Sequence, residues 1–330
     1  MKKIMWLLIA NCFLISCSKD VSDDTGIDHD LKDQDFKQEM RNFVIGISNY
    51  SKEIKPDFNI IPQNGIELVT KNGESTGIPD QEYLNSIDGN GQEDLFYGYD
   101  EDDKATAEEQ TNYLKKYLDI SKAAGKKILV TDYCSTANHI SNSKTWNQSA
   151  GYTSYAAISR ELDVVPNYAL QGENNQNIQK LSDIKNFLYL INPAGFSSKQ
   201  EFINKIKSTN YDLLILDLYF TDGKKFTSEE VSQLKKKANG GKRLVIAYMS
   251  IGEAENYRPY WNSSWNSKMP TWISAENPDW KGNFKVKYWD KEWQSIIFGN
   301  DNSYSKAILD ANFDGVYLDI IDAFEYFENQ

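Results

Sequence analysis

The sequence contains little of the chemistry that most catalytic and metal sites use. It has only two histidines, His29 and His139, and three cysteines. A Ser-His-Asp triad or a histidine-based metal site would have to rest on His139, because His29 lies in a polar stretch near the N-terminus. We interpret His139 as a loop residue and Cys134 as a small buried apolar side chain. The sequence therefore predicts neither a metal site nor a cofactor.

The one long apolar run is at the N-terminus. Lys2 and Lys3 precede apolar residues 4–15, a stretch shorter than the roughly 20 residues that span a membrane, so we interpret residues 1–16 as a signal peptide. The run ends in Leu-Ile-Ser-Cys, which resembles the bacterial lipoprotein signal. That resemblance implies that Cys17 is lipidated and begins the mature chain. An ordinary secretory signal is the alternative.

An acidic stretch follows the apolar run. Residues 18–35 contain seven aspartates and almost no apolar side chain. Such a segment cannot bury enough surface to offset its ordering entropy, so we expect residues 17–35 to be a flexible tether. Acidic residues directly after Cys17 resemble a signal that sends some Gram-negative lipoproteins to the cell surface. We therefore expect a protein anchored to the outer membrane, facing either the cell surface or the periplasm.

Cysteine content limits how the protein can be stabilised, and net charge limits the class of ligand that it can bind. With Cys12 removed and Cys17 lipidated, Cys134 has no partner for an intrachain disulfide, so stability must come from a hydrophobic core. The net charge of −12 argues against nucleic acid and anionic lipid as ligands, and it suits a neutral or cationic one. Twenty tyrosines and eight tryptophans suit a carbohydrate cleft, although core packing uses most aromatics. We expect a monomer.

The apolar pattern of residues 36–330 predicts a single α/β domain. Apolar residues at three- and four-residue spacing predict a helix over 36–54, ended by Pro56. Eight expected strands favour a (β/α)₈ TIM barrel, with an open doubly wound sheet as the alternative. We interpret residues 140–180 and 256–283 as loops over the barrel mouth. The strands are expected at 58–62, 84–92, 127–133, 187–191, 211–217, 244–249, 284–288 and 315–319.

Carboxylates gather where these expected strands end. An acidic side chain directly after a buried strand is costly unless it is hydrogen-bonded or used, so several such positions indicate a site. About half of them could instead cap the following helices. Asp314 precedes its strand, and we expect it to be structural. The candidates are Glu93, Asp132, Asp217, Glu253, Glu255, Asp319 and Asp322.

Five motifs resemble one known family. They are IIPQNG (60–65), GQEDLFYG (91–98), YMSIGEAENYRPYW (248–261), FKVKYWD (284–290) and FDGVYLDIIDAFEYF (313–327). Together they resemble glycoside hydrolase family 114, the endo-α-1,4-polygalactosaminidase group, and the resemblance covers nearly all of residues 36–330. The family order places the first two motifs last, whereas here they lead the chain. The sequence thus resembles a circular permutant, in which Glu328 and the helix at 36–54 would continue one another.

The resemblance also implies roles. Asp319 would be the nucleophile or base, and Glu93, by a weaker motif, the proton donor. Glycosidic cleavage itself needs one carboxyl kept protonated and one kept ionised. Arg258 could hold a carboxylate ionised through a bidentate pair. Acids expected to bind hydroxyl or ammonium groups are Asp217, Glu253, Glu255 and Asp322, and further residues expected to bind substrate are Asn64, Asp132, Tyr133, Tyr248, Trp289 and Tyr317.

These observations predict a glycoside hydrolase acting on an α-linked, galactosamine-containing polysaccharide with a carboxylate pair. Two other readings remain open. An inactive barrel could capture glycans at the cell surface, or the chain could be a structural lipoprotein. An assay for hydrolysis separates the glycoside hydrolase from these two alternatives.

Overall fold

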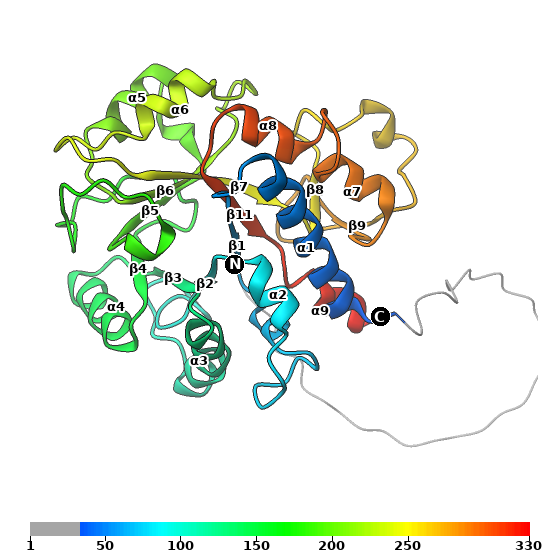
Figure 1. The fold of residues 1–330 in the computed structure, drawn as a ribbon, viewed down its shortest axis with the longest axis horizontal. Coiled ribbons are helices and arrows are strands. Elements are labelled where there is room, and N and C mark those ends of the chain that lie inside the picture. Colours follow the sequence, from blue (N-terminus) through cyan, green and yellow to red (C-terminus); the bar gives the residue numbers. More distant parts are fainter. Residues whose placement is uncertain (1–33) are drawn as a thin grey trace, which may run out of the picture. The chain divides into compact units, whose positions relative to one another are not determined.

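The computed structural model describes residues 34–330, which are built around two parallel sheets (Figure 1). The first has the strand order β1-β11-β7-β6-β5 and the second β2-β3-β4, with parallel pairing throughout. The predicted signal peptide, Cys17 and the tether up to residue 33 lie outside the described residues. The bounds are β1 (Asn59–Pro62), β2 (Gly89–Glu93), β3 (Lys127–Tyr133), β4 (Thr153–Ala157), β5 (Phe187–Leu190), β6 (Leu213–Asp217), β7 (Leu244–Ser250) and β11 (Gly315–Asp319).

The two sheets meet between β1 and β2. Gln63 and Gly91 form a parallel bridge. The Asp88 amide donates to the carbonyl of Ile60 at 2.9 Å, and the Ile60 amide donates to the Asp88 carboxylate at 2.9 Å. The eight strands therefore follow one another as β5, β6, β7, β11, β1, β2, β3 and β4. Across β4 and β5 the rings of Tyr155 and Phe187 lie 5.7 Å apart, and within residues 34–330 these strands share no backbone ladder.

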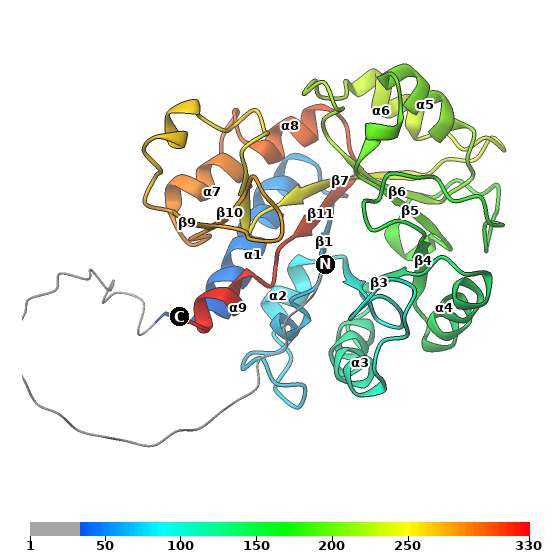
Figure 2. The same cartoon turned by 180° about the vertical axis from the view of Figure 1, so that it is seen from behind.

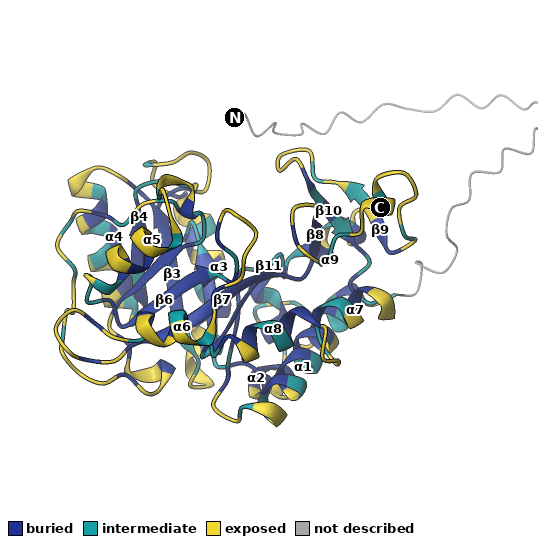
Figure 3. Ribbon diagram, turned by 90° about the horizontal axis from the view of Figure 1, so that it is seen from above, coloured by how far each residue is buried: buried dark blue, intermediate teal, exposed yellow. Residues whose placement is uncertain are grey.

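Helices cover the outer faces of the strands, so the strands are buried and the outward helical surfaces are exposed (Figures 1 and 3). The predicted helix is present with its expected bounds as α1 (Phe36–Ile54). No helix among residues 34–330 is long and apolar enough to cross a bilayer. The other helices are α2 (Gln81–Ser86), α3 (Glu108–Ala123), α4 (Ala137–Ala150), α5 (Lys199–Lys207), α6 (Ser228–Leu234), α7 (Lys291–Ile297), α8 (Tyr304–Asp310) and α9 (Ala323–Glu328).

The first described helix and the last one are neighbours. The Lys37 ammonium lies 2.5 Å from the Glu328 carboxylate, and the rings of Phe36 and Phe327 stack at 5.6 Å. Both views of the ribbon place α1 beside α9 (Figures 1 and 2). Glu328 and the helix at 36–54, which we expected to continue one another, therefore lie side by side.

One strand expected in the ring lies elsewhere. The residues expected as a strand at 284–288 fall largely in β10 (Asn283–Val286), which pairs antiparallel with β8 (Glu253–Glu255) and β9 (Ile273–Glu276) in a separate small sheet (Figure 2). The prediction that these residues form a ring strand is therefore wrong. A short apolar alternation looks the same in a parallel strand and in an antiparallel one, so periodicity alone does not separate the two.

Three other predictions of secondary structure need correction. The segment 140–180, expected to be a loop, contains most of α4 and the ring strand β4. The expected strand at 84–92 begins too early, because α2 occupies residues 81–86 and its N-cap Asp80 accepts a hydrogen bond from the Tyr83 amide at 3.0 Å. Segment 256–283, also expected to be a loop, contains β9 and one short 3₁₀ turn, η5 (Ser263–Asn266).

Candidate active site

A cavity of about 500 Å³ opens at the carboxyl ends of the parallel strands. Parallel strands present their carboxyl ends on one side, so residues that follow different strands converge there. The small β8-β10-β9 sheet supplies part of the wall through residues of β8 and β10. Ten sequence-predicted residues line the cavity: Asn64, Glu93, Tyr133, Asp217, Tyr248, Glu253, Glu255, Arg258, Asp319 and Asp322.

Glu93 ends β2 with its carboxylate in this cavity. Its Oε1 accepts a very short hydrogen bond from the Tyr133 hydroxyl, and the Asn64 amide lies 3.4 Å from Oε2. Burial, followed by the negative charges of Asp319 and Asp94, raises the pKa of Glu93 to about 7, while the Tyr133 hydrogen bond acts in the opposite direction. Near neutral pH, a large share of Glu93 therefore carries a proton.

Asp319 ends β11 and lines the same cavity. The Tyr248 hydroxyl donates a 2.7 Å hydrogen bond to Oδ2 of Asp319. Burial raises the pKa of Asp319 to about 6, against the lowering effects of the Tyr248 hydrogen bond and of the Ile320 amide. Burial and the charge of Asp319 likewise raise the pKa of Asp322 to about 7. The site thus contains several carboxyl groups that titrate close to neutrality.

One strand, β1, lies between β2 and β11. Adjacent strands are about 4.8 Å apart, so the backbones that carry Glu93 and Asp319 are roughly 10 Å apart. Both side chains line one cavity, and the charge of Asp319 acts on the pKa of Glu93. This arrangement agrees with the expectation that the two carboxyl groups face a common space.

The turns after the site-bearing strands contain backbone strain. Asn64, Asp94 and Ile320 have φ angles of 58°, 58° and 59°, in the left-handed region. For a β-branched residue such as Ile320 this conformation is an outlier. Each residue lies within two positions of a strand end, next to a cavity-lining side chain. Strain concentrated at one place in a fold is typical of functional sites, where surrounding contacts hold it.

A second group of charges forms another part of the cavity wall. The Arg258 guanidinium binds Glu255 through Nε at 2.6 Å and through a second nitrogen at 3.2 Å, and it reaches Asp217 at 2.7 Å. All three side chains are nearly buried. The bidentate pair expected for Arg258 is therefore present. Burial still raises the pKa of Asp217, although Arg258 lowers it.

Glu253 has an unused acceptor. The residue is 1% exposed and lines the cavity. Its Oε1 accepts hydrogen bonds from Asn277 at 2.7 Å and from Lys285 at 3.2 Å. Its Oε2 is buried and has no hydrogen-bond partner among the described residues. A buried carboxylate oxygen without a donor is costly, so this atom is suited to accept a hydrogen bond from a ligand.

Three residues expected to bind substrate lie outside the cavity lining. Asp132 is buried on the side of β3 that faces α4, where Ser143 and Asn147 donate to its carboxylate at 2.6 and 2.9 Å. Trp289 packs against Phe327 near the chain ends, and Tyr317 is fully buried among the strands. The position after a strand alone does not tell which face a side chain takes, so the sequence could not place these three side chains.

Arg160 lines the cavity and was missed by the sequence analysis. Its guanidinium binds Asp94 at 2.9 Å and Asp102 at 2.6 Å, and it lies 3.8 Å from the centre of the Tyr133 ring. It therefore supports the tyrosine that donates to Glu93. Arg160 follows β4, a strand that the sequence did not predict, so its place at a strand end could not be recognised.

His139 and Cys134, to which the sequence analysis gave no role in a site, lie away from the cavity. His139 is on α4, not in a loop as expected, with Nδ1 3.1 Å from Asp103 and its ring stacked on Tyr97. Cys134 is 1% exposed, and burial raises the pKa of its thiol to about 12. Among residues 34–330, no group of three or more His, Cys, Asp or Glu side chains could hold a metal ion.

Comparison with known proteins connects this geometry to one family. Residues 191–330 match glycoside-hydrolase family GH114. This range contains Asp217, Glu253, Glu255, Arg258 and Asp319. It begins after Glu93, the residue that we expect to be the proton donor. The match supports a glycoside hydrolase in general.

Curated relatives share a similar stretch. An uncharacterised protein of Methanocaldococcus jannaschii is 41% identical over 157 residues, covering 47% of this chain and 41% of that protein. An uncharacterised protein of Thermotoga maritima is 38% identical over 126 residues, 38% of this chain and 37% of its own length. A third, from Deinococcus radiodurans, is 37% identical over 131 residues, 40% of each chain. The chain spans about two fifths of the length of these relatives.

Proposed function

We propose that this protein is a glycoside hydrolase in which Asp319 and Glu93 form the catalytic pair. The observation that carries the proposal is one cavity that contains two strand-end carboxyl groups with pKa values raised to about 6 and about 7. Between these values Asp319 is mostly ionised and Glu93 mostly protonated. Those are the two protonation states that glycosidic cleavage needs. The family match over residues 191–330 supports the same reaction class.

The reaction follows from these states. Glu93 donates its proton to the glycosidic oxygen as the bond from that oxygen to the anomeric carbon breaks. The Asp319 carboxylate stabilises the positive charge that develops on the sugar ring, either by attacking the anomeric carbon or by taking a proton from the attacking water. Tyr133 and Tyr248 orient the two carboxyl groups through their hydroxyls.

We propose an α-linked polysaccharide that contains galactosamine as the substrate. The cavity lining has seven carboxylates against two guanidinium groups, which favours a ligand with ammonium groups. The unpartnered Oε2 of Glu253 is one acceptor for such a group. Tyr257 and Trp280, 61% and 52% exposed, offer rings at the cavity wall on which sugars could stack.

The test is a hydrolysis assay on purified protein with partly deacetylated galactosaminogalactan and other α-glycans as substrates. We expect cleavage by the wild-type protein and loss of cleavage, with binding retained, in Asp319→Asn and Glu93→Gln. Circular dichroism and thermal unfolding check that both variants fold. Wild-type turnover in both variants would refute the assignment. Binding without cleavage by the wild-type protein would favour the alternative, a glycan-capturing lipoprotein.

We further propose that the eight parallel strands close into a circularly permuted (β/α)₈ barrel. The neighbouring rings of Tyr155 and Phe187 and the contact between Lys37 and Glu328 support closure and permutation, respectively. In the corresponding experiment, residue 330 is joined to residue 36 by a short linker, and new termini are opened in the segment between β4 and β5. We expect this variant to fold and to keep activity. A chain that fails to fold would contradict the proposal.

We also propose that residues 1–16 direct export and that a lipid on Cys17 anchors the protein to the outer membrane. The support is the sequence pattern described above. Fractionation of the native bacterium shows which membrane carries the protein. Protease added to intact cells shows whether the protein faces the cell surface. We expect Cys17→Ser to move the protein into a soluble fraction. Light scattering of the protein without residues 1–17 tests the expectation of a monomer.

A further inference from the structure

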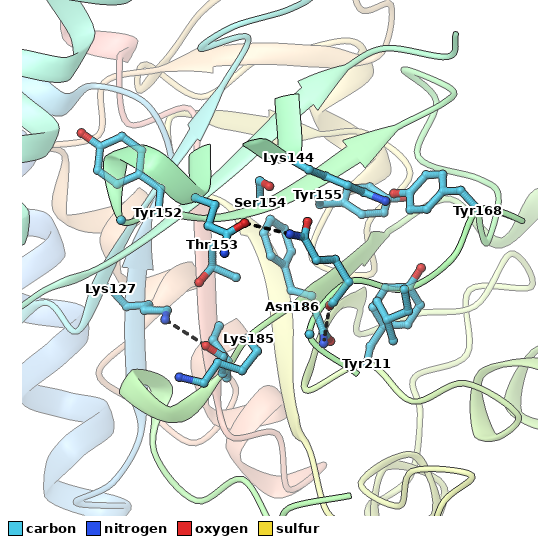
Figure 4. A pocket seen from close by; sticks show the side chains of 17 residues that line it. Lys127, Lys144, Tyr152, Thr153, Ser154, Tyr155, Tyr168, Lys185, Asn186 and Tyr211 are labelled. Carbon is cyan, nitrogen blue, oxygen red and sulfur yellow. Dashed lines mark hydrogen bonds between the residues drawn. The ribbon is translucent and has the colours of Figure 1, made fainter. Parts of the chain in front are cut away.

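The connection between β4 and β5 borders a second cavity, of about 310 Å³ (Figure 4). Residues 158–186 make this connection with no α-helix and only one short 3₁₀ turn, η3 (Leu181–Asp183). A parallel crossover normally covers its strands with a helix. Lys127, Thr153 and Phe187, the first residues of β3, β4 and β5, line the cavity, so it lies at the amino ends of these strands, whereas Glu93 and Asp319 lie at carboxyl ends.

The lining of this second cavity is positively charged. It contains three lysines, Lys127, Lys144 and Lys185, and no Asp or Glu, in a protein whose net charge is −12. Burial, and then the charge of Lys185, lower the pKa of Lys127, which means that the two ammonium groups repel each other. Lys185 is exposed and forms no ion pair with any residue from 34 to 330. An anion in the cavity would relieve this repulsion.

Unused hydrogen-bonding groups line the same space. Tyr155 and Tyr211 are 3% and 5% exposed, and within the described part of the chain neither hydroxyl, nor that of Ser154, has a hydrogen-bond partner. The Lys144 ammonium lies 4.0 Å from the centre of the Tyr168 ring, next to Tyr155 (Figure 4). These hydroxyl oxygens are open to the cavity rather than enclosed in the protein, so they can bind a ligand with several hydroxyl groups there.

We propose that this second cavity binds a monosaccharide-sized anion, a sugar that bears a carboxylate or phosphate group. Its volume is at the lower end of the range for small-molecule sites, which suits a single sugar ring. The ammonium groups of Lys127 and Lys185 bind the anionic group, and the hydroxyls of Tyr155 and Ser154 bind the ring hydroxyls. Lys144 lies apart from the other two lysines, beside Tyr155 and Tyr168 (Figure 4). The proposal does not depend on hydrolysis at Asp319, because the two cavities share no lining residue.

Isothermal titration calorimetry of the full-length protein tests the proposal. The probes are galacturonic acid, glucose 6-phosphate, inorganic phosphate and galactose, the last as the neutral control. The variants are Lys185→Met, which changes an exposed side chain, and Tyr155→Phe, which keeps the ring. Lys205→Met on α5 is the matched control, because it removes an exposed lysine outside the lining. Each titration is repeated in Trp280→Ala, which removes an exposed ring from the wall of the active-site cavity, so that ligand uptake in that cavity is recognised.

We expect at least one anionic sugar to bind about tenfold or more tightly than galactose. Lys185→Met should weaken that binding by about tenfold, as expected for one charge-assisted hydrogen bond, while Lys205→Met and Trp280→Ala should leave it unchanged. The preferred probe tells whether the anionic group is a carboxylate or a phosphate. Absence of binding, equal binding of galactose, binding of inorganic phosphate alone, or equal effects of the two lysine variants would each overturn the proposal.

Discussion

The hydrogen bond from Tyr133 to Glu93 offers the sharpest test of the catalytic assignment. The hydroxyl stabilises the ionised form of Glu93 and so holds the pKa of that carboxyl below the value that burial alone would give. Tyr133→Phe removes this donor and keeps the ring over which Arg160 lies. The proton on Glu93 should then persist to higher pH. A proton donor must be protonated to act, so the alkaline limb of the pH profile should move upward.

The size of the movement follows from the strength of the bond. A hydrogen bond to a charged group contributes about 1.5–3 kcal/mol, and one pKa unit corresponds to about 1.4 kcal/mol. The alkaline limb, expected near 7 from the pKa of Glu93, should therefore shift upward by about one to two pH units. The acid limb, set by Asp319 near 6, should stay in place.

The assay is kcat/KM for polysaccharide cleavage between pH 4 and pH 10, which reports the groups of the free enzyme. Tyr113→Phe is a matched control, because its hydroxyl donates to Glu67, outside the cavity lining, at 2.7 Å. We expect its profile to equal that of the wild-type protein. An alkaline limb that stays in place or moves to lower pH in Tyr133→Phe would refute the role of Glu93 as proton donor.

Three further predictions follow from neighbouring contacts. Tyr248→Phe removes the hydrogen-bond donor that lowers the pKa of Asp319, so the acid limb of the pH profile should move upward by about one pH unit in the same assay. An acid limb that stays in place would contradict the role of Asp319 as the ionised group. Arg160→Met should raise the alkaline limb by less than Tyr133→Phe does, because its charge is a smaller cause of the Glu93 shift. Lys237→Met removes the cation that lies 2.9 Å from the fully buried carboxylate of Asp212. The free energy of unfolding, measured in urea, should fall by about 3–5 kcal/mol. A fall below about 1 kcal/mol would show that hydrogen bonds alone stabilise this carboxylate.

The fold could be predicted where burial and apolar sequence coincide. The run Lys127–Tyr133 is apolar over much of its length, and β3 has the bounds that this pattern predicts. The strand-end acids Asp217 and Asp319 were found for the same reason, because an abrupt change from apolar to acidic marks a strand end. Asp314 likewise holds structural contacts, with Lys235 at 2.7 Å and Lys55 at 3.1 Å.

Other elements could not be predicted because neighbouring residues determine their burial. The strand β2 reads Gly-Asn-Gly-Gln-Glu and has no apolar side chain. Space explains this composition: a Cβ atom on Gly91 would lie 2.0 Å from the Tyr317 hydroxyl. The large ring on β11 therefore fills the interior that a side chain on β2 would otherwise occupy. The apolar periodicity within one segment does not reveal such complementarity between strands that are distant in the sequence.

The site depends on contacts between the two ends of the chain. Glu93 comes from the N-terminal half, outside the GH114 match, whereas Asp319 lies eleven residues before the last residue of the chain. Their common cavity exists because β1 pairs with β11 on one side and meets β2 on the other. Gly65 lies against the backbone of Asp322, where a Cβ atom would come within 3.1 Å of the Asp322 amide, and its φ of 51° also favours glycine. A side chain there would push the turn after β1 away from the turn after β11. The distance between the two proposed catalytic carboxyl groups is thus controlled by the packing of two turns that are about 250 residues apart in the sequence.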